Sequence, residues 1–154
     1  MGSNIAAEEN VKKSAELLRT TFPSIRFSSV YRTKAMEVEA QDDFLNAVAQ
    51  IETDHTPEEV FKLLQSIEQK LKKNAPFRYG PRTIDLDLLL YDERSIATPT
   101  LTIPHLGMHG RRFVLEPLLE LINPENHHPL LKKTWEELFS KVLDQKSKKV
   151  DILL

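Results

Sequence analysis

The chain has 154 residues, enough to bury the core of one domain, and its composition of 40% hydrophobic and 29% charged residues is that of a soluble globular protein. A formal net charge of −2 argues against non-specific binding of nucleic acid, which requires a basic surface. The lack of cysteine excludes disulfides and thiolate metal sites, and no apolar run reaches transmembrane length or forms a signal-peptide core. We therefore expect one domain over residues 1–154, cytoplasmic and monomeric, with no membrane or nucleic-acid partner.

The first third of the chain predicts one helix and one strand. Residues 2–4, Gly-Ser-Asn, suit a tight turn before a helix, with backbone amides free to meet an anion. Apolar residues at helical spacing predict a helix over residues 8–20, and Pro23 separates it from a predicted strand over residues 25–32. Residues 33–43 have no clear period, so we expect a long loop, a kind of segment that is often functional in compact domains.

The middle of the chain predicts a second strand and a second helix. Residues 44–52 alternate as a strand does, with Asn46 on the face opposite Leu45. Thr56 to Glu59 combine an N-cap, a first-turn proline and the acid of a capping box, which predicts a helix start. The apolar stripe of this helix is Val60, Leu64, Ile67 and Leu71, with Gln65 and Glu68 beside it. The lysines of its last turn either complement the helix dipole or bind phosphate, and they are Lys70, Lys72 and Lys73.

An alternating pattern after the turn signal Gly80-Pro81 is the most informative feature of the sequence. Period 2 predicts a strand whose buried parity is Ile84, Leu86, Leu88 and Leu90. Asp85 and Asp87 then share the opposite face as neighbours, roughly 7 Å apart from the rise of a strand. Paired carboxylates repel unless cations lie between them, and Arg82 and Mg²⁺ are the candidate cations. A solvated acidic face without a role is the alternative interpretation.

Basic residues follow the next predicted strand. Residues 101–103 predict a short strand that ends at Pro104. His105, Arg111 and Arg112 come soon after it and form a candidate clamp for a polyphosphate. For His105 the alternative is a turn histidine hydrogen-bonded to backbone.

The last third of the chain predicts two helices and an added strand. A short helix around Pro117 is expected within residues 114–122, and a second capping box at Thr134 opens another helix. The inward residues of that second helix are Trp135, Leu138, Phe139 and Val142. The apolar tail, residues 150–154, is expected to add a terminal strand. We expect three histidines on the surface, namely His109, His127 and His128.

Residues 78–89 follow a longer motif: basic, aromatic, Gly, Pro, Arg, two variable positions, Asp, aliphatic, Asp and two aliphatics. This stretch resembles the signature of the 6-hydroxymethyl-7,8-dihydropterin pyrophosphokinases, a family of folate-pathway enzymes. The other segments that resemble the family, in the family order, are residues 2–4, 31–33, 44–47, 101–105 and 111–118. The resemblance covers most of the chain up to about residue 123.

The order of predicted elements indicates an α+β protein, and the family shares that core. The expected fold is a ferredoxin-like α/β sandwich with a mostly antiparallel sheet, helices on one face and C-terminal additions. In the family a strand precedes the Gly-Ser-Asn turn and belongs to the central sheet. Only Met1 precedes the turn here, so we expect that first strand to be missing or very short.

The resemblance implies a reaction and a set of site residues. ATP would donate pyrophosphate to 6-hydroxymethyl-7,8-dihydropterin and release AMP, with two Mg²⁺ ions held by Asp85 and Asp87. The catalytic residues would be Arg82, Asp85, Asp87, His105 and Arg111. Those implied around ATP are Gln65, Glu68, Lys73, Arg78, Leu88, Leu101, Thr102, His105 and Arg111. Those implied around the pterin are Thr33, Met36, Phe44, Asn46, Tyr79 and Phe113, with Tyr79 and Phe113 stacking on its ring.

Other interpretations stay open from the sequence. Asn46 is either a pterin contact, because an amide offers both donors and acceptors, or an edge-strand residue that faces water. Asn74 and Ala75 stand where the family often has basic residues, which predicts weaker ATP binding. The chain is alternatively another Mg²⁺-dependent nucleotidyltransferase, or a non-catalytic ferredoxin-like module that binds ATP and pterin.

Overall fold

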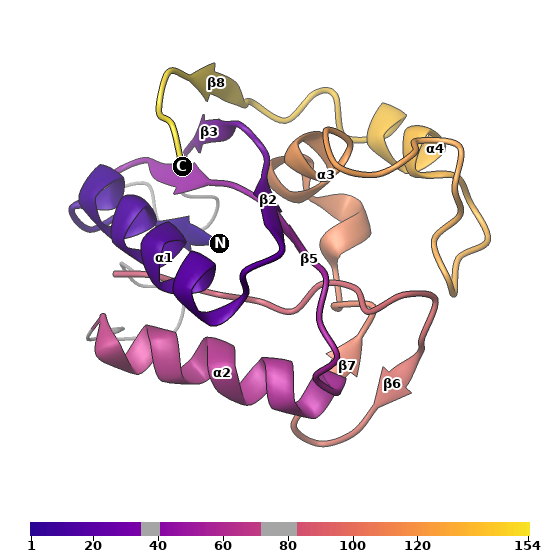
Figure 1. Cartoon of the computed structure of the whole chain (residues 1–154). Helices are drawn as coiled ribbons and strands as arrows, with labels where there is room; N and C mark the ends of the chain where they lie inside the picture. The colour runs from indigo at the N-terminus through magenta and orange to yellow at the C-terminus, as the bar shows by residue number, and fades with distance from the viewer. Residues whose placement is uncertain (35–40, 72–82) are drawn as a thin grey trace.

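The computed structural model describes residues 1–34, 41–71 and 83–154 (Figure 1). In it, the first predicted helix is α1 (Ala7–Thr21). Phe22 follows the helix, and its backbone N–H donates to the carbonyl of Leu18 at 2.7 Å. The buried face of α1 consists of Val11, Ser14, Ala15 and Leu18. Its apolar members have the helical spacing that predicted the helix.

The second predicted helix is α2 (Pro57–Lys70), and it packs beside α1 on the same side of the molecule (Figure 1). The predicted capping box is confirmed, because the Thr56 side chain accepts from the Glu59 N–H while the Glu59 carboxylate accepts from the Thr56 N–H. Val60, Leu64 and Ile67 are buried, as the stripe predicted. Two amphipathic helices therefore present one apolar layer to the sheet.

A four-stranded antiparallel sheet lies against these helices. Its strands, in spatial order, are β1 (Gly2–Ser3), β4 (Phe44–Asn46), β3 (Val30–Thr33) and β8 (Lys148–Val150). The α+β, ferredoxin-like fold class is thereby confirmed. Gly2 and Ser3, which were predicted to form a tight turn, instead form β1, a very short strand, because they pair with Asn46 and Leu45 of β4. A terminal strand, β8, is present, but it shares only Val150 with the predicted residues 150–154, so the predicted position was wrong.

Each of the two long predicted strands is divided into two. Residues 25–32 form β2 (Ile25–Phe27) and then β3, while residues 44–52 form β4 and then β5 (Ala49–Ile51). β2 and β5 pair with each other in a separate antiparallel sheet. Ser28 causes the break, because its hydroxyl accepts from the Val48 N–H at 2.9 Å and donates to the next carbonyl at 2.8 Å. Single continuous strands were therefore a wrong prediction: at the break the Ser28 N–H still donates to the Val48 carbonyl at 2.9 Å, but the return bond goes to the Ser28 side chain instead of its backbone.

The C-terminal part adds a hairpin and two short helices. Strand β6 (Ile96–Ala97) pairs with β7 (Thr102–Ile103), and Pro104 follows in a cis peptide bond. A 3₁₀ turn, η1 (Met108–Gly110), leads into α3 (Arg112–Leu118), which contains Pro117 as predicted. The last helix, α4 (Trp135–Ser140), begins at the predicted capping box on Thr134.

Two apolar clusters fill the interior on opposite sides of the strands. The first joins α1 and α2 to the sheet, and it includes Val11, Leu45, Ala47, Leu64, Ile84 and Leu86. The second joins α3 and α4, and it includes Val48, Met108, Leu115, Trp135 and Leu138. Ala47 and Val48 are sequence neighbours in different clusters, as the period of 2 in a strand requires. Trp135 is a core residue, as predicted.

His128 is buried, so the prediction that it lies on the surface was wrong. Only 3% of the residue is exposed, and its Nδ1 accepts from the backbone N–H groups of Leu130 and Leu131 at 3.2 Å each. Its ring lies 5.3 Å from the ring of Trp135 and 6.1 Å from that of His109. Burial and then the nearby His109 lower the pKa of His128, so the neutral ring is the form that the fold holds.

The burial of neutral His128 predicts a pH-dependent stability. Because its pKa is lower in the folded than in the unfolded chain, its contribution is complete above the unfolded value of about 6.5 and is lost as the pH falls below it. We expect the free energy of unfolding, measured by urea titration, to decrease from pH 7.5 to pH 5. His128→Asn keeps a side-chain acceptor for the two N–H groups and should flatten this dependence. An equal loss of stability in that variant and in the parent would contradict the assignment.

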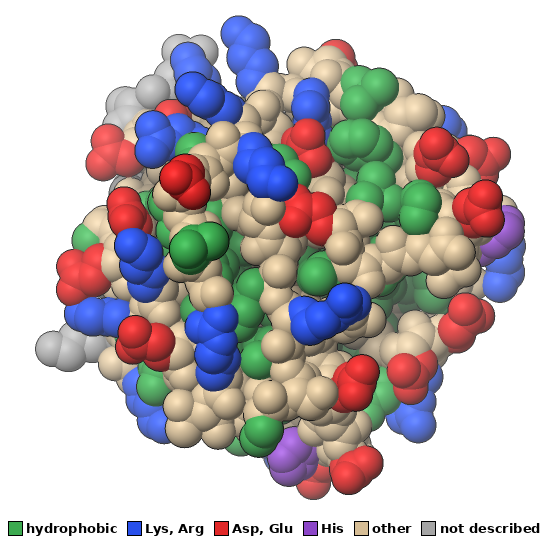
Figure 2. Space-filling view, turned by 45° about the horizontal axis from the view of Figure 1, so that its top comes forward, with side chains coloured by type: hydrophobic (Ala, Val, Ile, Leu, Met, Phe, Trp, Pro, Cys, Tyr) green, Lys and Arg blue, Asp and Glu red, His purple; other side chains and the backbone are tan. Residues whose placement is uncertain are grey.

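The surface carries mixed charge. Figure 2 shows acidic and basic side chains interspersed over the displayed face, with hydrophobic side chains between them. None of the helices within the described ranges is long and apolar enough to cross a bilayer.

Candidate active site

The segment that carries Asp85 and Asp87 crosses the molecule next to β1. Asp85 forms an antiparallel bridge with Gly2, each residue donating its N–H to the carbonyl of the other, at 2.8 and 3.0 Å. Ile84 and Leu86 are 0% and 7% exposed, whereas Asp87 is exposed. The predicted alternation is thus confirmed over these four residues. Asp85 and Asp87 are two residues apart, so both lie on the side of the segment that faces away from the core.

Beyond Asp87 the segment departs from the prediction of a strand. Residues 88–91 are extended but have no assigned strand partner within the described chain. Leu88 packs against the first apolar cluster, while Leu89 and Leu90 both pack against the second. The expected parity of Leu90 was therefore wrong, since without a ladder the backbone is free to lose its period.

Glu68 ties α2 to the aspartate segment. Its Oε1 accepts from the backbone N–H of Leu86 at 2.8 Å, midway between Asp85 and Asp87. Gln65 lies three residues earlier on α2 with its side chain exposed. This contact joins the backbone between the two aspartates to α2, and the sequence did not reveal it because the partner is a backbone group.

The amino group of Met1 lies close to the carboxylates. It donates to the carbonyl of Ala47 at 2.9 Å. Desolvation lowers the pKa of this amine, and the negative charges of Asp87, Asp85 and Glu68 act in the opposite direction. Acidic side chains from two parts of the chain thus surround one end of β1.

The carboxylate oxygens of Asp85 and Asp87 suit a hard cation that also coordinates oxygens of a bound substrate. No group of three or more His, Cys, Asp or Glu residues within the described ranges could enclose a metal ion by itself. Two carboxylates, Asp85 and Asp87, are nevertheless what Mg²⁺ uses when substrate phosphates supply further oxygens. The residues therefore fit a magnesium site that forms together with a nucleotide.

The adjacent arginines Arg111 and Arg112 have different surroundings. Arg112 forms a two-bond ion pair with Glu116, with N–O distances of 2.9 and 3.0 Å, and also donates to the carbonyls of Leu143 and Gln145. Arg111 instead lies over the ring of Phe113, with its guanidinium carbon 5.8 Å from the ring centre. The predicted two-arginine clamp was thus half wrong, because Arg112 holds α3 to the C-terminal segment. The i, i+4 spacing of Arg112 and Glu116 was the signal that could have shown this.

Arg111 belongs to the turn that follows β7. A Cβ built on Gly107, which has φ 79°, would lie 3.8 Å from Nε and Nη2 of Arg111, so the guanidinium rests beside this glycine. His105 lies just before it, and its backbone N–H donates to the carbonyl of Leu89 at 2.9 Å. His105 is thus held to the aspartate segment through its backbone. Leu101 is buried and Thr102 half-buried in the same hairpin.

Thr33 and Asn46 form a buried polar pair between β3 and β4. The Asn46 Nδ2 donates to Oγ1 of Thr33 at 2.9 Å, and the two residues are 6% and 7% exposed. An edge-strand position that faces water is therefore excluded for Asn46. Its Oδ1 lies beside Gly2, where an added Cβ would come within 2.9 Å. Phe44 pairs with Thr33 in the ladder and is half-buried.

Five of the predicted site residues lie outside the described residues, namely Met36, Lys73, Arg78, Tyr79 and Arg82. Their roles stay predictions. The described site residues fall into three groups, one on the aspartate segment and α2, one on β3 and β4, and one on the β7 hairpin, the turn after it and the start of α3.

Comparison with known proteins identifies the family. The family model described as 7,8-dihydro-6-hydroxymethylpterin-pyrophosphokinase (HPPK) matches residues 1–123. This chain belongs to that family. The HPPK match ends before α4 and β8, so these two elements are the C-terminal additions to the matched region.

Bacterial HPPK relatives match over most of their length. The 2-amino-4-hydroxy-6-hydroxymethyldihydropteridine pyrophosphokinase of Bacillus subtilis is 39% identical over 124 residues, covering 79% of this chain and 74% of that protein. The protein of the same name from Aquifex aeolicus is 35% identical over 138 residues, covering 89% of this chain and 86% of that protein. The folic acid synthesis protein fol1 of Schizosaccharomyces pombe is 39% identical over 136 residues, but this chain spans only 19% of its length.

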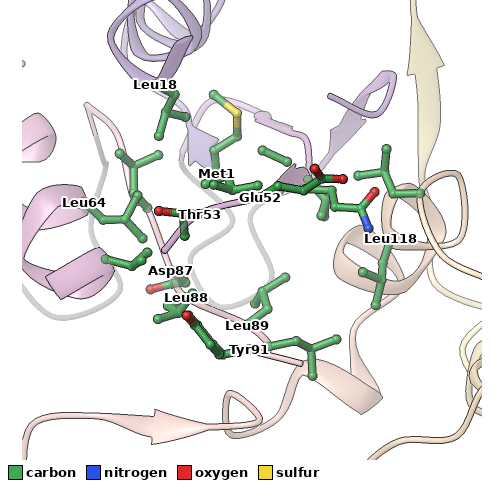
Figure 3. Close-up of a pocket in the computed structure, with 18 of the residues that line it drawn as sticks. Met1, Leu18, Glu52, Thr53, Leu64, Asp87, Leu88, Leu89, Tyr91 and Leu118 are labelled. Atoms are coloured by element: carbon green, nitrogen blue, oxygen red, sulfur yellow. The ribbon is translucent and has the colours of Figure 1, made fainter. Parts of the chain in front are cut away.

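One cavity borders the candidate HPPK site at Asp87. It has a volume of about 550 Å³, and Asp87 stands at its wall among leucines and the ring of Tyr91 (Figure 3). Most of its lining is apolar, with Leu18, Leu64, Leu88, Leu89 and Leu118 among the residues around it. None of the described lining residues has a basic side chain that could partner a triphosphate.

Proposed function

We propose that this HPPK-family chain transfers the β,γ-pyrophosphate of ATP to the hydroxymethyl oxygen of 6-hydroxymethyl-7,8-dihydropterin, a step of folate synthesis. The observation that carries the proposal is the family match over residues 1–123, which includes the Asp85–Asp87 segment and the Thr33–Asn46 pair. In the reaction the oxygen–β-phosphorus bond forms, the bond from that phosphorus to the α-phosphate oxygen breaks, AMP leaves, and the hydroxyl proton passes to solvent.

Each described group has a role that follows from its chemistry. Asp85 and Asp87 would hold two Mg²⁺ ions, which when bound neutralise the phosphates and lower the pKa of a coordinated hydroxyl. Glu68 keeps the two aspartates in place through the Leu86 N–H. Arg111 supplies a positive charge to the transferring phosphates, and His105 a second polar group beside it.

The pterin would be held by groups with complementary shapes. Phe113 offers an aromatic face, and Phe44 an apolar edge beside the buried Asn46–Thr33 pair. The Asn46 amide is fixed in one orientation because its Nδ2 donates to Thr33. Its carbonyl oxygen would then accept a hydrogen bond from an N–H donor of the pterin. We further propose that the enzyme acts as a monomer in the cytoplasm.

The nucleotide product tests this function directly. The chain is mixed with ATP, Mg²⁺ and 6-hydroxymethyl-7,8-dihydropterin, and the nucleotides are separated by chromatography. AMP that forms only when the pterin is present is the expected result. ADP would show ordinary phosphoryl transfer and contradict the proposal. AMP formation independent of the pterin would point to another nucleotide reaction.

Phe113 provides a test of the pterin site. Phe113→Leu keeps an apolar side chain but removes the aromatic face, and stacking is worth about 1 kcal/mol, so pterin affinity should fall about fivefold. ATP affinity should be almost unchanged. Both are measurable by isothermal titration, with Phe139→Leu on α4 as the matched control. An equal loss for both ligands would contradict the stacking assignment.

A further inference from the structure

The side chain of Gln145 bonds to the backbone on both sides of a candidate catalytic residue. Its Oε1 accepts from the backbone N–H of Arg112 at 2.9 Å, and its Nε2 donates to the backbone carbonyl of Gly110 at 2.8 Å. Arg111 is the single residue between these two partners. One carboxamide therefore holds the backbone before and after Arg111.

The two partners of Gln145 belong to different helical elements. Gly110 is the last residue of the 3₁₀ turn η1, and Arg112 is the first residue of α3. Arg111 joins them in an extended conformation, with φ −124° and ψ 110°. The direction in which the Arg111 side chain leaves the backbone thus depends on how η1 and α3 are placed relative to each other, and the Gln145 carboxamide fixes that placement.

Gln145 also supplies an acceptor that α3 lacks locally. The first N–H groups of a helix have no partner within the helix, and a side chain at the N-cap commonly accepts from one of them. Arg111 is the N-cap residue of α3, and its side chain makes no such bond in the described chain, because a guanidinium carries donors only. The carboxamide of Gln145, 33 positions along the chain from Arg112, accepts from the helix instead.

The carboxamide stands on a segment that is itself held in place. Nη1 of Arg112 donates to the backbone carbonyls of Leu143 and Gln145, at 2.8 and 3.0 Å. The Gln145 N–H donates at 3.1 Å to the carbonyl of Val142, a buried member of the second apolar cluster. Figure 1 shows the segment between α4 and β8 running past α3. Gln145 is therefore fixed both to α3 and to the core.

The guanidinium of Arg111 depends on this backbone for its position. It rests beside Gly107 and lies over the ring of Phe113. Both are packing contacts, which direct a charged group less strictly than a bidentate ion pair does. A misplacement of a reacting or stabilising group by about 1 Å can lower a rate by about 100-fold. The backbone clamp is thus of direct consequence for a residue that contacts phosphates.

We propose that Gln145 is a positioning residue for the reaction: by clamping the backbone at Gly110 and Arg112, it directs the Arg111 guanidinium toward the transferring phosphates. This role rests on the proposed function, in which Arg111 contacts those phosphates. Gln145 lies beyond residues 1–123, which the family model matches. The C-terminal segment therefore contributes a residue to a site whose other candidate residues all lie within the matched region.

The test replaces Gln145 with Met, which has a similar length but lacks the amide groups. We expect kcat/KM for ATP, measured as AMP formation, to fall about tenfold, and the Tm to fall by at most about 4 °C. Gln50→Met on β5 is the matched control, because it also removes a glutamine that accepts a side-chain hydrogen bond, in this case from Arg26. The control should keep the turnover of the parent.

An Arg111→Ala background separates positioning from a general loss of structure. The guanidinium that Gln145 directs is absent there, so adding Gln145→Met should lower kcat/KM by less than about twofold further. A further tenfold loss in the double variant would show that Gln145 does not act through Arg111 and would overturn the proposal. Parent-like turnover of the single Gln145→Met variant would overturn it too.

Amide hydrogen exchange tests the clamp without turnover. The Arg112 N–H should exchange about tenfold faster in Gln145→Met than in the parent, because it loses its acceptor, and the Gln50→Met control should leave its exchange unchanged. An unchanged exchange rate in Gln145→Met would contradict the clamp. If the parent forms no pterin-dependent AMP, the proposed reaction fails, and the exchange rate still decides whether Gln145 holds this backbone.

Discussion

Replacing Asp87 with Asn is expected to lower the rate of AMP formation by at least about 100-fold while leaving the Tm within about 2 °C of the parent. Asp87 is exposed, so its carboxylate contributes little to the core, and the amide that replaces it keeps the size of the side chain. The loss comes from the cation site, because a neutral oxygen holds Mg²⁺ far less well than a carboxylate. Turnover is measured by nucleotide chromatography and the Tm by circular dichroism.

Asp92→Asn is the matched control for this prediction. Asp92 lies in the turn that ends the same segment, is exposed, and has φ 48°, a conformation that Asn adopts readily. The control should keep both turnover and stability. A large loss of Tm in Asp87→Asn would instead show that the carboxylate serves the fold, and full turnover would remove Asp87 from the catalytic site.

The neighbouring arginines should separate activity from stability. Arg111→Ala is expected to lower kcat/KM for ATP by about 100-fold with an unchanged Tm, because it removes a positive charge whose observed contact in the described chain is with the ring of Phe113 rather than with an acid. Arg112→Ala is expected to destabilise the fold by about 2–3 kcal/mol, which lowers the Tm by about 5–10 °C. It leaves the half-buried Glu116 without its ion pair and two carbonyls without their donor.

The two variants control for each other, since they remove the same side chain at adjacent positions. Steady-state kinetics at a temperature well below both Tm values gives the first effect, and thermal unfolding gives the second. If Arg112→Ala lost activity while its Tm stayed unchanged, the assignment of the two arginines would be reversed.

Local patterns predicted most elements because their causes are local. The capping boxes at Thr56 and Thr134 involve side chains three residues apart, and both are formed as expected. The alternation of Ile84, Asp85, Leu86 and Asp87 likewise gave the correct buried and exposed sides. The α+β class, the antiparallel sheet and the apolar stripes of α1 and α2 could be predicted for the same reason.

The errors concern residues whose partners are distant in sequence. Ser28 ends a strand by bonding to Val48, and His128 is buried because Trp135 and His109 pack around it. The difference between Arg111 and Arg112 depends on the C-terminal segment near Gln145. Of these contacts, only the i, i+4 pair of Arg112 with Glu116 has a pattern within a short window.

By itself the sequence determined the family, the fold class and the pairing of Asp85 with Asp87 on one side of a strand-like segment, because motif order and period 2 are properties of the chain alone. Only the tertiary structure decided that Glu68 accepts from the backbone of this segment and that Asn46 is buried against Thr33. The physical reason is that hydrogen bonds and packing between remote segments depend on how the layers meet, which the local periodicity of a chain does not encode.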